Sequence, residues 1–86
     1  MEKNLINHNI TTQNTRADII GELDAIIQYE NHLEITDDPV AKHTIEDIVR
    51  EEKMHVGQLF GLLFRLDPES KKQFEAGYQE FLESAR

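Results

Sequence analysis

Two Asp-Pro pairs, Asp38-Pro39 and Asp67-Pro68, divide the sequence into three segments. An aspartate cap followed by proline at the first helical position is typical of a helix start, and proline also ends a preceding helix. Apolar residues recur at helical spacing along the chain, and no stretch alternates with the two-residue period of a strand. The sequence therefore predicts an all-α fold.

The first two predicted helices run from Arg16 to about Glu34 and from Pro39 to Leu66. At helical rise the second is about 40 Å long. Residues 35–38 form a short connection, which makes the two helices antiparallel neighbours in a hairpin. A shorter third helix follows the second Asp-Pro pair. Its apolar residues on one side are Phe74, Tyr78, Phe81 and Leu82.

Residues 1–14 are rich in Asn and Thr and show no sustained period. They are expected to form a mobile N-terminal tail, with His8 in solvent. Thr15 followed by Asp18 resembles a helix start, because a threonine cap and an early acidic residue suit exposed N–H groups. Residues 15–86 then make up one domain.

The chain is small and acidic, with 86 residues, 9 Lys and Arg against 17 Asp and Glu, and a formal charge of −8. A core of this size is marginal without a staple, and the absence of Cys excludes disulfides and thiolate metal sites. The acidic charge opposes nucleic-acid binding, and no apolar run is long enough to span a membrane. A partner subunit is the usual source of the missing core.

One charged residue interrupts the apolar stripe of the second predicted helix. Glu52 falls near the stripe's centre, and His55 follows three residues later near its edge. A lone ionised carboxylate is costly at such a position, so it must be paired, protonated or bound to a metal. Glu-x-x-His is also the spacing of four-helix di-iron and di-manganese proteins, although it occurs by chance in many helices.

A hairpin that turns near residue 37 places position 22 level with position 52, and position 22 is Glu. Glu30 is better centred on the first helix's stripe, but at helical rise it lies about 12 Å from the Glu52 layer. Glu22 is therefore the favoured partner. The bundle di-metal site needs two Glu helices and two Glu-x-x-His helices, so one chain supplies half a site. A two-fold homodimer would complete both the bundle and the site, with Glu52 near the axis.

The remaining candidate ligands have simpler interpretations. His32 lies at the end of the first predicted helix and His43 on the polar side of the second, so both are expected in solvent. Glu51 lies about 100° round the helix from Glu52 and is expected to be exposed or salt-bridged, with a secondary cation site as its alternative.

The segments GELDAIIQYENHLE and IVREEKMHVGQLFGLLFRLDPE resemble the encapsulated ferritins, over roughly residues 18–83. The resemblance implies a di-iron ferroxidase centre shared by two chains, with Glu22 and His55 as terminal ligands and Glu52 bridging two irons. Tyr29 would lie in the surround of the site. It further implies a ring of dimers, a decamer in this family, with the third helix packing between dimers. The sequence departs from the family at Gly21 and Gln28, where relatives tend to carry acidic or aromatic residues near the metal entry route.

These features lead to one functional hypothesis and one main rival. The first is a ferroxidase that oxidises Fe(II) with dioxygen or peroxide at an interface site holding two irons, for iron storage or detoxification. The rival is a non-catalytic helical oligomer in which Zn(II), Ca(II) or Mn(II) clamps the dimer; other divalent cations can substitute for iron in either case. A third hypothesis is a monomeric adaptor that binds no metal. It does not explain why Glu22 and Glu52 lie side by side at the same distance from the turn of the hairpin. The chain is expected in the cytoplasm. Many members of the family carry a C-terminal tail that docks them inside an encapsulin shell, and this sequence ends in FLESAR without such a tail, so enclosure in an encapsulin nanocompartment stays an open alternative.

Overall fold

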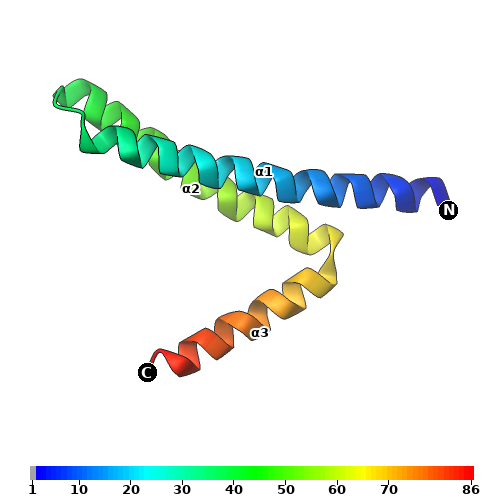
Figure 1. Ribbon diagram of the computed structural model, residues 1–86. Helices are drawn as coiled ribbons and strands as arrows, with labels where there is room; N and C mark the ends of the chain where they lie inside the picture. Colours follow the sequence, from blue (N-terminus) through cyan, green and yellow to red (C-terminus); the bar gives the residue numbers. More distant parts are fainter. Residues whose placement is uncertain (1) are drawn as a thin grey trace.

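The computed structural model describes the backbone of residues 2–86 and the side chains of residues 9–86. Three helices follow one another: α1 (Glu2–Glu34), α2 (Pro39–Leu66) and α3 (Pro68–Ser84). Helices α1 and α2 lie side by side as an antiparallel hairpin, and α3 leaves the end of α2 at an angle (Figure 1). The predicted all-α fold, with a hairpin and a shorter C-terminal helix, is confirmed.

Both Asp-Pro pairs act as the sequence predicts. The side chain of Asp38 caps α2 by accepting a hydrogen bond from the backbone N–H of Ala41 at 2.8 Å. Asp67 ends α2 and also caps α3, with Pro68 in the first turn of the new helix. These two caps fix the bounds of α2 as predicted.

The predicted start of the first helix at Thr15 is wrong, because α1 extends back to Glu2. The hydroxyl of Thr15 donates to the backbone carbonyl of Thr11 at 2.8 Å instead of accepting from N–H groups ahead of it. Threonine makes this bond inside helices as well as capping them, so its position alone did not distinguish the two roles. The mobility of residues 1–14 stays a prediction, and the side chain of His8 lies outside those described.

The core of the hairpin is thin. Among residues 9–86, four apolar side chains are buried, and the polar Thr12 and Thr15 are buried as well. The backbone extends over 54 × 40 × 14 Å, so the three helices form a flat plate. The buried apolar residues are Ile19, Ile45, Val49 and Leu63.

Many large apolar side chains remain exposed on this plate. On α1, Ile20, Leu23 and Ile27 are exposed at one-face spacing, and on α3 Tyr78 and Phe81 are more than half exposed. Exposed apolar side chains grouped on one helix face are typical of an interaction surface. None of the three helices, over the part of the chain described, has the length and apolar character needed to cross a bilayer.

Candidate metal centre

Glu52 and His55 project side by side from the middle of α2. Residues three apart on a helix lie on the same face, which brings the imidazole Nδ1 of His55 to 3.7 Å from Oε2 of Glu52. The carboxylate lies within the apolar stripe that packs against α1, as predicted. Its side chain is 20% exposed, against 47% for His55.

Glu22 approaches the same point from α1. Its Oε1 lies 3.4 Å from Nδ1 of His55, so the contact crosses the hairpin. One ligand atom from each of the three residues lies within 4.8 Å of the other two. The structure thus brings Glu22, Glu52 and His55 together, which is the arrangement that the level placement in a hairpin predicts.

One oxygen in this group has no partner. Oε2 of Glu22 is buried and accepts no hydrogen bond in the described part of the chain. An unsatisfied buried acceptor costs about 1–3 kcal/mol, and more when it is charged. A bound cation would remove this cost, so the orphaned oxygen fits a metal at this point.

The donor set suits a divalent transition metal. Carboxylate oxygens are hard anionic ligands, imidazole suits iron and zinc, and the group contains no soft sulfur ligand. Three side chains leave coordination positions open for further ligands or for substrate. Ligand type alone does not select iron over its neighbours in the first transition series.

A hollow of about 470 Å³ opens beside the group. On the α1 side the hollow is lined by the small residues Ala17, Gly21 and Ala25, which recur at four-residue intervals. A Cβ atom added at Gly21 would have no atom within 4 Å, so the surface of α1 is open there. Another helix can approach closely over such small residues. The remaining lining residues are Asp18, Glu22, Glu52 and Leu59.

Asp18 is a residue of this hollow that sequence reasoning did not single out. The sequence pattern predicts it at a helix start, whereas in the structure it lies within α1, one turn before Glu22. The four-residue spacing from Glu22 was the signal that could have identified it.

Glu30 and Tyr29, the other α1 candidates, lie outside the three-residue group. The Glu30 carboxylate lies 3.6 Å from Nζ of Lys53 and is half exposed. Tyr29 is half-buried on α1, and its place in the surround of the site stays a prediction.

The other candidates on the polar faces also lie apart. His32 and Glu51 are exposed. His43 makes an exposed contact with Asp47 on the same helix, with Nε2 and Oδ2 3.4 Å apart. Within the described residues, Glu22, Glu52 and His55 form the group of three potential ligands that could hold a metal ion.

No family model matches this chain. Two known proteins are similar to it, and the names of both refer to encapsulins. A ferritin-like-encapsulin shell fusion protein of Pyrococcus furiosus is 41% identical over 68 residues, covering 79% of this chain and 20% of that protein. The encapsulin nanocompartment cargo protein EncC of Myxococcus xanthus is 33% identical over 66 residues, covering 77% of this chain and 51% of that protein. This chain thus spans a fifth and about half of the two relatives.

A solved structure extends the likeness to the fold. The crystal structure of the encapsulated ferritin domain from Pyrococcus furiosus matches with a TM-score of 0.84 and 37% sequence identity. The match covers 88% of this chain and 78% of that domain. Identity and coverage at this level relate the two by common descent as well as by shape.

Proposed function

Because the chain belongs to the encapsulated ferritin family, we propose that it is a ferroxidase, with Fe(II) as its substrate and Fe(III) as its product. The observation that carries the proposal is the convergence of Glu22, Glu52 and His55 from two helices around a buried oxygen without a partner. The residues of this chain are the proposed ligands, and Tyr29 is proposed to lie close behind them.

A homodimer is proposed to complete the site. One chain supplies two carboxylates and one imidazole, which is half of the set that a bundle di-iron centre uses. Because Ala17, Gly21 and Ala25 are small, a second copy of the chain can approach the three potential ligands closely on this side. In the proposed two-fold arrangement Glu52 and its mate lie near the axis and bridge the two irons, while one Glu22 and one His55 serve as terminal ligands of each iron.

The roles of the side chains follow from their chemistry. The carboxylates of Glu22 and Glu52 neutralise the cations and stabilise Fe(III) more than Fe(II), since they are hard anionic ligands. His55 is a neutral donor that tolerates Fe(II). Two Fe(II) ions give up one electron each. Dioxygen takes up these two electrons and two protons to form hydrogen peroxide, or one peroxide molecule takes them up with two protons to form two waters.

The assembly and location are proposed from the relatives. We propose that dimers form a ring, a decamer as in the family, with the exposed apolar faces of α1 and α3 providing further contacts. The relatives are named as an encapsulin cargo protein and as a fusion to an encapsulin shell. We therefore propose the interior of an encapsulin nanocompartment in the cytoplasm as the place where the chain works, for iron storage or detoxification.

Oxygen uptake after anaerobic loading with Fe(II) tests the activity. The wild-type protein should consume oxygen and form Fe(III) faster than buffer, and Glu52→Ala should abolish the difference. Glu51→Ala is the matched control, because it removes the same charge one position away from an exposed side chain. Equal rates for Glu52→Ala and wild type would overturn the proposal.

The structural-clamp alternative predicts a different result from the same samples. Size-exclusion chromatography with light scattering on metal-free and Fe(II)-loaded protein measures the oligomer. A metal-dependent dimer without oxygen uptake would replace the ferroxidase with a non-catalytic clamp that holds Zn(II), Ca(II) or Mn(II). A monomer in both states would contradict any shared site.

A further inference from the structure

The direction of α3 depends on a single connecting residue. Asp67 lies between the last residue of α2 and the first residue of α3, with φ −136° and ψ 85°. Proline at position 68 disfavours helical backbone at Asp67, so α2 cannot run straight on into α3. Rotation about the backbone of Asp67 would swing the whole of α3 relative to the hairpin.

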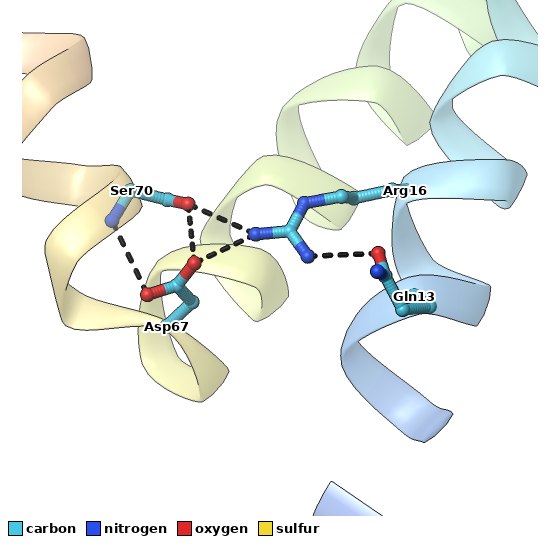
Figure 2. Close-up of polar contacts among 4 residues, drawn as sticks. All are labelled: Gln13, Arg16, Asp67 and Ser70. Carbon is cyan, nitrogen blue, oxygen red and sulfur yellow. Dashed lines mark hydrogen bonds and ion pairs between the residues drawn. The ribbon is translucent and has the colours of Figure 1, made fainter. Parts of the chain in front are cut away.

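A cluster of polar side chains surrounds this hinge (Figure 2). Nη2 of Arg16, on α1, donates to Oδ2 of Asp67 at 2.6 Å and to Oγ of Ser70, on α3, at 3.2 Å. The hydroxyl of Ser70 in turn donates to the same carboxylate oxygen at 2.6 Å. Nη1 of Arg16 donates to Oε1 of Gln13 at 2.9 Å, which orients the guanidinium. One arginine thus joins α1, the hinge and the first turn of α3.

Side chains, and not helix packing, connect α1 to α3 in the described part of the chain. Over the described residues α1 packs along α2, and α2 packs against α3, but α1 and α3 do not pack against each other. Phe74 of α3 contacts Phe60 and Phe64 of α2, with ring centroids 5.5 and 5.2 Å apart. The aromatic contact holds α3 near α2, and Arg16 ties its first turn to α1.

We propose that Arg16 is a positioning residue that locks the Asp67 hinge and so sets the direction in which α3 leaves the hairpin. A guanidinium suits this role because its donors lie in a rigid plane, so that one group can hold several acceptors in a fixed geometry. The direction matters because α3 carries exposed Tyr78 and Phe81, and the hinge sets where these apolar side chains lie relative to the hairpin.

The electrostatics of the hinge agree with this geometry. The hydrogen bond from the Ser70 hydroxyl, aided by the Ser70 N–H and by Arg16, lowers the pKa of Asp67, although partial burial opposes the shift. The carboxylate is therefore ionised when it accepts from Arg16. The two side chains are 40% and 28% exposed, and such ion pairs add little to stability. We therefore expect substitution of Arg16 to change the direction of α3 and to leave the melting temperature close to that of wild type.

Distance measurement between spin labels tests the proposal directly. The sequence has no cysteine, so Lys42→Cys on α2 and Gln79→Cys on α3 give two unique, exposed attachment points. Doubly labelled chains are diluted with unlabelled protein, so that the distances within one chain dominate. The variants are Arg16→Gln, Arg16→Lys and Ser70→Ala. Arg50→Gln is the control, because its ion pair with Asp47 joins residues of the same helix.

Arg16→Gln should broaden the distance distribution and shift its mean, while helix content by circular dichroism stays at the wild-type level. Arg16→Lys and Ser70→Ala should broaden it less, because each retains part of the cluster, and Arg50→Gln should match wild type. If Arg16→Gln does not fold, Arg16→Lys and Ser70→Ala decide the question. Distributions identical to wild type in the folded Arg16 and Ser70 variants would overturn the proposal and leave the aromatic contact as what directs α3.

Discussion

Nδ1 of His55 lies 3.4 Å from Oε1 of Glu22, so the candidate metal centre depends on the register of the α1–α2 hairpin. That register is set by the short turn at residues 35–38, where Asp38 caps α2 at its first turn. Each helix rises about 1.5 Å per residue, so lengthening the turn would slide Glu22 past His55. The distance between Glu22 and His55 therefore depends on the length of the turn at residues 35–38.

The Glu22 carboxylate should affect stability differently with and without metal. Glu22→Gln removes a negative charge within 4.8 Å of the Glu52 carboxylate, so the metal-free variant should be at least as stable as wild type. Free metal at a hundred times its dissociation constant should stabilise wild type by about 2.7 kcal/mol, and the variant far less. Thermal melts with a chelator or with anaerobic Fe(II) measure both effects.

Glu30→Gln is the control for this comparison, because Glu30 contacts Lys53 outside the group. It should keep the full gain in stability on metal addition. An equal gain for Glu22→Gln would mean that Glu22 is not a ligand.

His55 should be needed for metal binding, and His43 should not. Loss of a residue that only orients a metal ligand costs about 10–100-fold in metal affinity. Loss of a ligand should cost at least as much, so His55→Ala should weaken Fe(II) binding at least about tenfold. His43→Ala removes the same side chain from an exposed contact with Asp47 and should bind as wild type does. Anaerobic titration calorimetry measures the affinities, and parallel losses in the two variants would contradict the assignment.

Sequence reasoning predicted the hairpin and its three potential ligands because each depends on local, periodic signals. The Asp-Pro pairs located the helix ends, and the turn length then placed Glu22 level with Glu52. It missed the early part of α1, because the Thr15 hydroxyl bonds back to Thr11 inside a helix as readily as it would cap one. It also missed the contact between Arg16 and Asp67, because these two side chains meet across the open end of the hairpin and no local pattern pairs residues so far apart in sequence.

Leu62 should be essential for the proposed dimer. It lies seven residues after His55, two turns along the same face of α2, and is 41% exposed in the single chain. Leu62→Glu would bury a charge in the interface, which is costly without a partner, so dimer and oxygen uptake should be lost together. Ile35→Glu is the control, because Ile35 is 82% exposed at the hairpin tip. Light scattering measures the oligomer, and an intact Leu62→Glu dimer would place the interface elsewhere.

The Asp67 hinge should loosen in acid. The pKa of Asp67 in the folded chain lies below its ordinary value of 3.8, chiefly because the Ser70 hydroxyl donates to the carboxylate. A group whose pKa is depressed by folding contributes stability above its ordinary pKa and loses that contribution as pH falls through the folded value. The contribution should therefore be complete above about pH 4 and should disappear below it.

Two variants isolate this effect from the titration of the other carboxylates. Asp67→Asn retains a helix-capping side chain but cannot titrate, so its stability relative to wild type should improve as pH falls below 3.8. Ser70→Ala should raise the pKa of Asp67 toward 3.8, because it removes the largest cause of the shift. The carboxyl carbon chemical shift of Asp67 reports the pKa directly. A Ser70→Ala titration curve that overlays the wild-type curve would show that the hydroxyl does not hold the hinge carboxylate in its charged form.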